Sequence, residues 1–460
     1  MMNETLDTYT LKNAAAVLGV SCADDAVFQR VRTDSRTLQA GDLFVALKGP
    51  NFDGHDHVEQ AQHKGAVGAV VSTKQDIEFA QLEVKDTRLA LAQLAKARRA
   101  AFKGKVVGLT GSNGKTTVKE MIAAILRESG KVLATKGNLN NDIGVPLTLL
   151  ELEGDEAFAV IEMGANHPGE IAFLTDTTKP DVALITNAGA AHLEGFGSIE
   201  GVARAKGEIY SGLTKNGKAI VNLDDKYSGY WESIVTAYEI IGFALENKEA
   251  LITASNIREI DGINHFTIKT PNGECEVSLN FPGEHNVQNA LAATSIAYAL
   301  NVDLDKVKIG LQSLLPVKGR LNFIAGRNGC LVIDDTYNAN RDSMKAAIDV
   351  LAKESRRKIA VLGDLFESGE NANELHAEIG VYAHEKGIDE FYGLGELSKN
   401  ATDAFNASNN ALNGEGKHFL DKDQLTQQLQ QKLDENIAIL IKGSRGMRME
   451  EVVEKLIGGA

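Results

Sequence analysis

Residues 106–117 contain the residue types that bind a phosphate group. They read Val-Val-Gly-Leu-Thr-Gly-Ser-Asn-Gly-Lys-Thr-Thr. Gly111 and Gly114 allow the backbone to turn several N–H groups toward one anion at the start of the helix that follows. Lys115 adds a positive charge for the β- and γ-phosphates of a nucleotide, and the hydroxyl of Thr116 can bind Mg²⁺. The segment predicts a nucleotide-phosphate site, with a purely structural glycine turn as the alternative.

This loop is a variant of the P-loop pattern Gly-x-x-x-x-Gly-Lys-Thr, because Leu109 stands where the first glycine is expected. A run of apolar residues before the loop predicts a buried strand. Apolar residues at helical spacing predict a helix after it, and these are Val118, Met121, Ile122, Ile125 and Leu126. A strand, a glycine turn and a helix in this order favour the functional interpretation.

Two further polar residues follow predicted strands. Glu162 lies at the end of a strand over 157–163, and His192 lies in an Ala/Gly loop after a strand over 182–187. Ligands of open α/β sheets bind beyond the carboxyl ends of the strands, so we expect Lys115, Glu162 and His192 to converge. Glu162 is a candidate Mg²⁺ ligand or a helix cap. His192 is a candidate ligand of a second cation or a structural histidine.

Strands that alternate with helices predict an α/β fold of three domains. We expect a small mixed α/β amino-terminal domain over 1–103, a central P-loop ATPase-like domain with a mostly parallel sheet over 104–318, and a Rossmann-like carboxyl-terminal domain over 319–460. The predicted helices cover 11–18, 57–64, 87–102, 199–213, 343–352 and 374–386. The other predicted strands cover 28–31, 43–47, 66–71, 132–135, 331–334, 358–362 and 437–442.

Several polar loops are weaker candidates for binding. Residues 33–36 could bind an anionic group or form an ordinary turn, and residues 282–289 could recognise a base edge or cap a helix. Residues 334–340 and 442–448 follow strands of the last domain and are either ligand-facing loops or plain connections. Lys206 lies in a predicted helix, where a lysine is ordinarily solvated.

Composition excludes several classes of function. The 460 residues include 63 acidic and 48 basic side chains, for a net charge of −15, which makes nucleic acid an unsuitable partner. The densest basic cluster is Arg98, Arg99, Lys103 and Lys105, which we interpret as the solvated face of a linking helix. Three widely spaced cysteines, no export signal and no apolar run of membrane-spanning length predict a cytoplasmic protein.

Seven segments together resemble the Mur ligase family, and the resemblance spans all three predicted domains. They are Thr110 to Thr117, Gly137 to Pro146, Glu162 to Asn166, Ala191 to Ser198, Gly283 to Asn289, Asp334 to Asn340 and Lys442 to Met449. The phrases that begin at Ala191, Asp334 and Lys442 resemble the members that add D-alanyl-D-alanine. Arg341 departs from the pattern, because these members usually have proline at that position.

The resemblance implies an ADP-forming ligase that acts on UDP-N-acetylmuramoyl-tripeptide and D-Ala-D-Ala in peptidoglycan precursor synthesis. It implies that ATP phosphorylates the terminal carboxylate of the tripeptide, and that the amine of the dipeptide then displaces phosphate.

It also implies a role for individual residues. ATP is expected at Gly111, Ser112, Asn113, Gly114, Lys115, Thr116 and Thr117, with Asn286 and Asn289 on adenine and Arg320 and Asp335 on the phosphate and ribose. Mg²⁺ is expected at Thr116, Glu162 and His192, together with Lys206 where that lysine is carbamylated. Lys115, Glu162, His192 and Lys206 form the expected catalytic set. The substrates are expected at Ser35 and Arg36 for UDP, at Asn138 and Asn141, and at Asn338 and Asn340 for the dipeptide.

Other assignments stay open at this stage. A ligase that adds a different amino acid, such as the tripeptide-forming member or a folylpolyglutamate synthase, is the nearest alternative. A P-loop kinase and a non-catalytic nucleotide-dependent regulator are further ones. No short motif distinguishes a tripeptide ending in lysine from one ending in diaminopimelate, and a monomer is expected. Because ATP would lie between two domains, the last domain is expected to close over it, with a hinge near Pro316 to Arg320.

Overall fold

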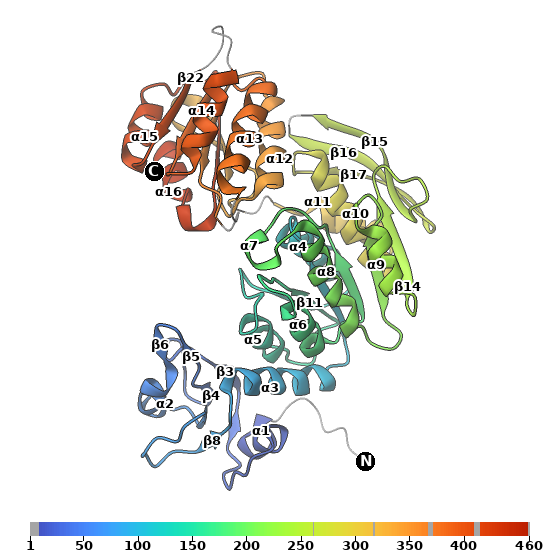
Figure 1. Ribbon diagram of the computed structural model, residues 1–460. Helices are drawn as coiled ribbons and strands as arrows, with labels where there is room; N and C mark the ends of the chain where they lie inside the picture. The colour runs from blue at the N-terminus through green and yellow to red at the C-terminus, as the bar shows by residue number, and fades with distance from the viewer. Residues whose placement is uncertain (1–8, 261, 316–317, 367–370, 409–414, 459–460) are drawn as a thin grey trace.

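The computed structural model describes residues 9–260, 262–315, 318–366, 371–408 and 415–458. The chain forms three α/β bodies in a row, with the amino-terminal body at one end and the carboxyl-terminal body at the other (Figure 1). Each body has its own sheet. The predicted three-domain α/β class is confirmed, whereas the boundaries at 103/104 and 318/319 stay a prediction.

The amino-terminal domain contains a four-stranded parallel sheet in the order β3-β4-β7-β8. Its elements are β1 (Tyr9–Thr10), α1 (Leu11–Leu18), β2 (Val27–Phe28), β3 (Arg30–Arg32), β4 (Asp42–Val45), β5 (Lys48–Gly49), β6 (Phe52–Asp53), α2 (Val58–His63), β7 (Gly68–Val71) and β8 (Gln81–Glu83). The predicted helix over 11–18 has the predicted bounds. Its N-cap Thr10 accepts a hydrogen bond from the backbone of Asn13, and its C-cap Gly19 is left-handed, so both ends of this helix are set locally.

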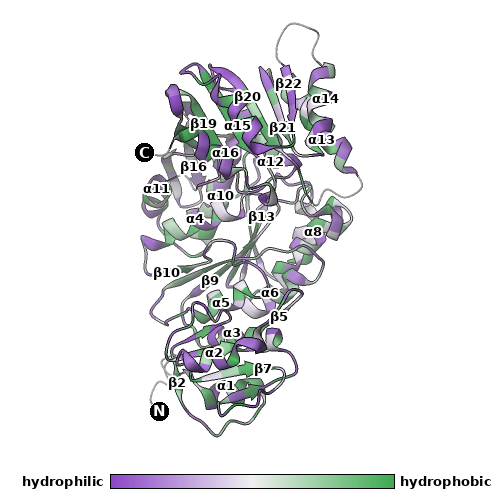
Figure 2. Cartoon of the chain, turned by 90° about the vertical axis from the view of Figure 1, so that its left-hand side faces the viewer, coloured by the Kyte–Doolittle hydropathy of each residue, from purple (hydrophilic) through white to green (hydrophobic). Residues whose placement is uncertain are grey.

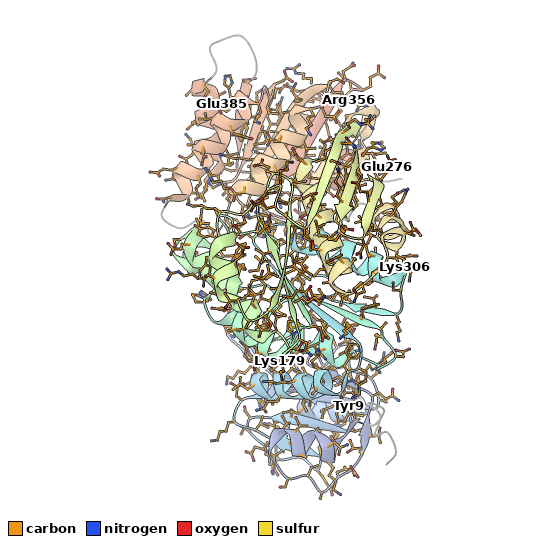
Figure 3. All side chains as sticks on the ribbon, turned by 90° about the vertical axis from the view of Figure 1, so that its right-hand side faces the viewer. Tyr9, Lys179, Glu276, Lys306, Arg356 and Glu385 are labelled. Carbon is orange, nitrogen blue, oxygen red and sulfur yellow. The ribbon has the colours of Figure 1, made fainter. Side chains whose placement is uncertain are left out.

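Helix α3 (Thr87–Ala101) lies between the amino-terminal domain and the central domain (Figure 1). Figure 3 labels Tyr9 and Lys179, which lie on either side of it. The Arg98 guanidinium lies 4.5 Å from the centre of the Tyr9 ring and donates to the carbonyl of Leu152. Arg99 donates to the carbonyl of Lys179 at 2.8 Å.

The interpretation of this basic cluster as a solvated face is therefore wrong for two of its members. Arg98 and Arg99 are buried, while Lys103 and Lys105 are exposed. The helix packs between two domains, and backbone carbonyls of the central domain supply the hydrogen bonds that water would otherwise provide. No local sequence pattern reports such a neighbour.

The central domain is built on a nine-stranded sheet in the order β10-β11-β9-β12-β13-β14-β15-β16-β17. Its strands are β9 (Lys105–Thr110), β10 (Val132–Ala134), β11 (Phe158–Glu162), β12 (Val182–Ile185), β13 (Lys218–Asn222), β14 (Glu239–Ala244), β15 (Ile252–Ile260), β16 (Ile263–Thr270) and β17 (Gly273–Leu279). The sheet is parallel from β10 to β15, and β16 and β17 extend it in antiparallel pairing. Strand β9 lies between β11 and β12, so the loops after these three strands meet at one edge.

The helices of this domain cover both faces of the sheet. They are α4 (Lys115–Arg127), α5 (Gly144–Leu150), α6 (Glu170–Thr178), α7 (Leu193–Phe196), α8 (Ile199–Gly207), α9 (Ser228–Ile234), α10 (Glu284–Ala299) and α11 (Leu304–Gln312). The predicted helix over 199–213 is α-helical only to Gly207, and a 3₁₀ turn continues it to Gly212. The three strands between 252 and 279 were not predicted. They contain no continuous apolar run, although the alternating burial of β15 is typical of a half-buried strand.

The carboxyl-terminal domain has a six-stranded sheet in the order β18-β19-β23-β20-β21-β22, parallel except for β18. Its elements are β18 (Asn322–Ala325), β19 (Leu331–Asp335), α12 (Arg341–Ala352), β20 (Arg357–Gly363), α13 (Ala372–Glu385), β21 (Glu390–Leu394), α14 (Ser398–Ser408), β22 (Glu415–Phe419), α15 (Lys422–Gln430), β23 (Ile437–Lys442) and α16 (Glu450–Ile457). Residues of α12, α13 and α14 share one core, and residues of α15 and α16 share the other. Helices on both faces give the predicted doubly wound arrangement.

Hydrophobic strands run through the interior of the molecule, between helices with hydrophilic outer sides (Figure 2). In the described part of the chain, none of the helices combines the length and the apolar character needed to cross a bilayer.

Candidate active site

The loop between β9 and α4 has backbone geometry that only glycine accommodates without strain. Gly111 has φ +151° and Gly114 has φ +78°. A Cβ atom at Gly111 would collide with the hydroxyl of Thr186, and one at Gly114 would lie 2.6 Å from Oδ1 of Asn289. The two glycines therefore let the loop pack against the end of β12 and the start of α10.

Lys115 is the first residue of α4, and its side chain folds back over the loop. Its Nζ donates to the carbonyl oxygens of Gly111 at 2.7 Å and Ser112 at 3.2 Å. Burial lowers the pKa of Lys115, and the carboxylate of Glu162 acts in the opposite direction. The ammonium is thus held at the mouth of the loop, where a phosphate would neutralise it.

Thr116 and Glu162 form a buried, hydrogen-bonded pair of oxygen-bearing side chains. The Thr116 hydroxyl donates to Oε2 of Glu162 at 3.0 Å, and Nδ2 of Asn140 donates to Oε1 at 2.9 Å. Adjacent ligands of an octahedral Mg²⁺ with bonds of ~2.1 Å lie ~3 Å apart. The donor atoms therefore fit a Mg²⁺ ion. Glu162 caps no helix, because α6 begins only at Glu170.

His192 lies in the loop that follows β12, with φ +53°. Two backbone N–H groups of this loop are fixed by the central domain itself. Ala188 donates to the carboxylate of Asp225 at 2.8 Å, and Gly189 donates to the hydroxyl of Ser112 at 2.9 Å. Burial raises the pKa of Asp225. The P-loop and the His192 loop are therefore joined to each other directly.

Lys206 is buried on α8, with 1% of its surface exposed, unlike an ordinary helical lysine. Its Nζ lies 5.5 Å from the centre of the Phe196 ring. Burial lowers the pKa of Lys206 to about 7, and the charge of Lys115 acts in the same direction. Lys206 is absent from the walls of both cavities described below.

The predicted adenine residues lie in the first turns of α10. Nδ2 of Asn286 donates to the carbonyl of Pro282 at 2.7 Å, and Nδ2 of Asn289 donates to Oδ1 of Asn286 at 3.0 Å. His285 lies beside them, and burial lowers its pKa to about 4, so its imidazole is neutral at pH 7. This arrangement leaves polar groups with fixed orientations beside the P-loop.

The carboxyl-terminal domain contacts the P-loop through two side chains. Nη2 of Arg320 donates to the Thr116 hydroxyl at 2.8 Å, and Nδ2 of Asn340 donates to Oδ1 of Asn113 at 2.7 Å. The guanidinium of Arg320 also lies 4.2 Å from the centre of the Tyr337 ring. Residues that are more than 200 positions apart in the sequence thus form one site.

Asp335 lies deeper in this interface. Lys442 at the end of β23 forms an ion pair of 2.6 Å with Asp335 and donates to the carbonyl of Asn338 at 2.8 Å. Burial raises the pKa of Asp335, and Lys442 opposes this shift.

These residues surround a cavity of about 970 Å³ between the domains. The predicted residues in its wall are Ser112, Asn113, Gly114, Lys115, Thr116, Thr117, Asn138, Asn141, Glu162, His192, Asn286, Asn289, Arg320, Asp335, Asn338 and Asn340. A second cavity of about 180 Å³ shares Lys115, His192, Asn338 and Asn340 with it.

Three predicted residues lie outside this wall besides Lys206. Gly111 is the first residue of the loop after β9, and Ser35 and Arg36 lie in the amino-terminal domain. Arg36 is paired with Asp34 at 2.8 Å, and the carbonyl of Ser35 accepts from Lys64 at 2.7 Å. The amino-terminal contribution to the cavity comes instead from Asp86, Arg88 and Leu89, at the start of α3.

Sequence reasoning missed several residues of the wall. Arg88 forms an ion pair of 2.8 Å with Asp142, and His285, Tyr337 and Asp342 also line the cavity. His285 lies within residues 282–289 and Tyr337 within residues 334–340, two polar loops predicted as candidates for binding, so the sequence contained a signal for both. Asp142 lies in the segment Gly137 to Pro146. Arg88 has no motif of its own, because only the packing of α3 brings it to Asp142.

Arg341 does not disturb the turn after Asn340. It is the first residue of α12, where Asn340 and Ser343 form a reciprocal capping box. This is the helix position that best accepts proline, so the usual proline and the present arginine are compatible with one backbone. Arg341 makes a bidentate ion pair with Glu378 in addition.

Three family descriptions match this chain. The Mur ligase family catalytic domain matches residues 27–99, the Mur ligase middle domain matches residues 109–297, and the Mur ligase glutamate ligase domain matches residues 319–445.

Similar proteins match over nearly the whole length. The UDP-N-acetylmuramoyl-tripeptide--D-alanyl-D-alanine ligase of Escherichia coli is 46% identical over 94% of both chains, and that of Bacillus subtilis is 37% identical over 97% of this chain and 98% of its own. A crystal structure of MurF from Acinetobacter baumannii superposes with a TM-score of 0.90 at 38% identity, covering 97% of this chain and 98% of that one. The structure of MurF ligase from Thermotoga maritima in complex with ADP gives 0.82 at 29% identity, covering 93% and 96%.

Proposed function

This chain belongs to the Mur ligase family, and we propose that it joins D-alanyl-D-alanine to UDP-N-acetylmuramoyl-tripeptide at the expense of ATP. It is an ADP-forming ligase of peptidoglycan precursor synthesis. The observation that carries this proposal is the convergence of the P-loop, Glu162, the His192 loop and carboxyl-terminal side chains on one cavity. That cavity has room for a nucleotide beside a peptide end.

The reaction has two steps. The terminal carboxylate of the tripeptide attacks the γ-phosphorus of ATP, which forms an acyl phosphate and releases ADP. The free amine of the dipeptide then attacks the acyl carbon and forms a tetrahedral intermediate. Phosphate leaves as the amide forms, and the amine gives up a proton. A carboxylate is a poor electrophile, so the first step makes the second one possible.

Positive charge is the main contribution of the protein to this chemistry, because two anionic groups, the tripeptide carboxylate and the triphosphate of ATP, must approach one another. Lys115 would bind the β- and γ-phosphates, and Arg320 would bind the γ-phosphate from the other domain. Mg²⁺ would be held by Thr116 and Glu162, with His192 and a modified Lys206 for a second ion, and it supplies charge neutralisation at the transferred phosphoryl group. Asn286 and Asn289 would orient the adenine.

The tripeptide would enter the cavity from the side of α3. Asn138 and Asn141 lie in the wall between α3 and the P-loop, next to Arg88 and Asp142. Ser35 and Arg36 lie further out in the amino-terminal domain, and we assign them to the UDP end of this long substrate. Its length explains why no single cavity needs to contain all of these residues.

The second cavity suits the dipeptide. Its volume of about 180 Å³ equals that of about six waters at ~30 Å³ each, which is too small for a nucleotide. It opens beside Lys115 and His192, where the acyl phosphate would form. Phe366 and Leu375 offer apolar surface for the two methyl groups, and Arg445 offers a cation for the carboxylate. Oδ1 of Asn338 accepts a hydrogen bond from the backbone N–H of Arg445 and so holds the backbone of Arg445 in place.

Arg320 and Asn340 contact the P-loop in this structure, and we assign these contacts to a closed position of the carboxyl-terminal domain. Residues 316–317 of the proposed hinge lie outside the described residues. Gly319 and Leu321 next to them have φ of +76° and +49°. Small-angle scattering should show a smaller radius of gyration when an ATP analogue and the tripeptide substrate are added together. An unchanged radius would contradict closure.

Phosphate release tests the function directly. Purified protein should release phosphate and ADP from ATP only when the tripeptide substrate and D-Ala-D-Ala are both present. Parallel assays with lysine and diaminopimelate tripeptides decide which substrate is used. Formation of a stable phosphoester in the absence of D-Ala-D-Ala would indicate a kinase. Nucleotide binding without any phosphate release would indicate a regulatory protein. Addition of a single amino acid, such as glutamate, in place of the dipeptide would indicate a ligase with a different substrate.

The remaining assignments follow from the same chemistry. ATP and UDP-linked precursors are cytoplasmic metabolites, so we place the protein in the cytoplasm. One chain contains all of the proposed site, so we assign a monomer, which sedimentation at assay concentration tests. Chelation by EDTA should stop turnover, and added Mg²⁺ should restore it.

A further inference from the structure

Three consecutive N–H groups of the His192 loop donate to three side chains from different parts of the chain. Ala188 donates to Asp225 at 2.8 Å, Gly189 donates to Ser112 at 2.9 Å, and Ala190 donates to Oδ2 of Asp342 at 3.1 Å. The first two acceptors belong to the central domain. Asp342 belongs to the first turn of α12 in the carboxyl-terminal domain. All three N–H groups therefore have these partners only while the two domains are in contact.

The approach of Asp342 depends on the absence of a side chain at position 189. A Cβ atom on Gly189 would lie 2.5 Å from Oδ2 of Asp342 and 3.4 Å from Nδ2 of Asn113. An aspartate is too short to move aside while its Cα stays in α12, so a larger residue would push the helix away. The neighbouring contact between Asn340 and Asn113, at 2.7 Å, lies in the same interface.

The loop needs such support because of its backbone conformation. His192 has φ +53°, a left-handed conformation that costs about 1 kcal/mol for a residue with a side chain. The orientation of its imidazole depends on where the preceding residues are held. Ala190 is only two residues away, so its hydrogen bond to Asp342 bears directly on that orientation.

We propose that Asp342 is a positioning residue that couples domain closure to the geometry of the His192 loop. When the carboxyl-terminal domain closes, the carboxylate accepts the Ala190 N–H and the loop adopts the shape that the reaction requires. When the domain opens, that N–H returns to water and the loop loosens. This inference rests on the proposed function, because it gives His192 its place beside the acyl phosphate.

The substitution Asp342→Asn distinguishes this role from the alternatives. An asparagine keeps an oxygen that accepts the Ala190 N–H, but it has no charge. A carboxylate that stabilised the positive end of α12, or that held a cation, would act through its charge. A positioning role therefore predicts that asparagine substitutes well and alanine does not.

Steady-state kinetics measure the effect. Asp342→Ala should lower kcat about tenfold, the usual effect of one lost hydrogen bond, while the KM for ATP changes much less. Asp342→Asn should stay within about threefold of the parent protein. An Asp342→Asn variant as slow as Asp342→Ala would overturn the proposal.

Gly189→Ala tests the same contact from the other side. It should lower kcat at least as much as Asp342→Ala. Because both changes break one contact, the double variant should be no slower than Gly189→Ala alone, and it should be faster where removal of the carboxylate gives the new methyl group room. Effects that multiply would show that the two positions act independently and would overturn the coupling.

Hydrogen exchange measures the protection of the backbone N–H groups in the loop, independently of turnover. In the parent protein with ATP analogue and tripeptide substrate, a peptide covering 187–193 should exchange slowly. It should exchange faster in Asp342→Ala and Gly189→Ala and at the parent rate in Asp342→Asn, with all melting temperatures alike. Equal exchange in all four proteins contradicts the proposal. A parent protein that releases no phosphate contradicts the proposed function instead, so the two failures are distinguishable.

Discussion

The guanidinium of Arg320 donates a hydrogen bond of 2.8 Å to the hydroxyl of Thr116, across 204 residues of sequence. Thr116 in turn donates to Glu162. A side chain of the carboxyl-terminal domain thus reaches the pair of oxygens that we assign to the metal. The arrangement explains how that domain can affect phosphate chemistry on a loop that belongs to another sheet.

Arg320→Ala should raise the KM for ATP and lower kcat. A hydrogen bond to a charged group contributes about 1.5–3 kcal/mol, so kcat/KM for ATP should fall by about 10- to 150-fold. Arg320→Lys should be intermediate, because it keeps the charge and loses the planar fork. Arg327→Ala, at an exposed arginine of the same domain, is the control and should be unchanged. A change in KM for the dipeptide alone would contradict the assignment of Arg320 to phosphate.

Lys115→Ala should leave the fold intact and remove turnover. The Lys115 ammonium is held against two carbonyl groups of the loop, and burial lowers its pKa, so its removal costs the folded state little. Its charge is needed when phosphate is transferred, and we expect kcat to fall by at least ~10²-fold. Circular dichroism and melting temperature check the fold, and phosphate release checks activity.

Lys136→Ala is the matched control for this experiment. Its side chain is exposed and pairs with Glu151 at 2.7 Å, so activity should be unchanged. Substantial phosphate release by Lys115→Ala would show that the loop is not the phosphate site.

His285 should make stability depend on pH. Burial lowers the pKa of His285 to about 4, against 6.5 in the unfolded chain, so the unfolded state binds more protons between these values. Stability therefore falls as the pH falls through this window. Because the ring borders a cavity, we expect a loss of about 2 kcal/mol from this group between pH 6.5 and 4.

The comparison protein for this prediction is His285→Gln, which does not titrate in the window. Urea unfolding at half-unit steps of pH should give it a shallower loss of stability than the parent protein. Parallel curves for the two proteins would mean that the imidazole protonates alike in the folded and unfolded states.

Arg341→Pro should preserve α12. Proline suits the first position of a helix, and the chain-entropy gain of about 0.4–1 kcal/mol offsets the lost ion pair with Glu378, which is partly exposed. The free energy of unfolding should change by less than about 1 kcal/mol, which urea unfolding measures.

Ser343→Pro provides the contrast two positions further on. The backbone N–H of Ser343 donates to Oδ1 of Asn340 at 2.9 Å, and its hydroxyl accepts from the Asn340 N–H at 3.0 Å, so proline would remove both hydrogen bonds of the capping box. We expect a loss of about 1–2 kcal/mol. Equal effects of the two prolines would mean that the helix does not begin at Arg341.

The sequence by itself determined the elements whose signals are local. The bounds of α1 and of β23 agree with the prediction, because a cap, a turn residue or a continuous apolar run marks each end. The P-loop was equally readable, since the requirement for glycine at Gly111 and Gly114 is a property of the backbone there. The Mur ligase resemblance came from motifs of the same local kind and is confirmed by similarity over nearly the whole chain.

Only the tertiary structure decided which side chains meet across domains. It buried Arg98 and Arg99 between two bodies, enclosed Lys206 on α8, and brought Asp342 to Ala190. It also left Ser35 and Arg36 apart from the main cavity and put Arg88 in its wall. The physical reason is that hydrophobic periodicity and turn chemistry act over a few residues, whereas these contacts depend on how whole sheets and helices pack.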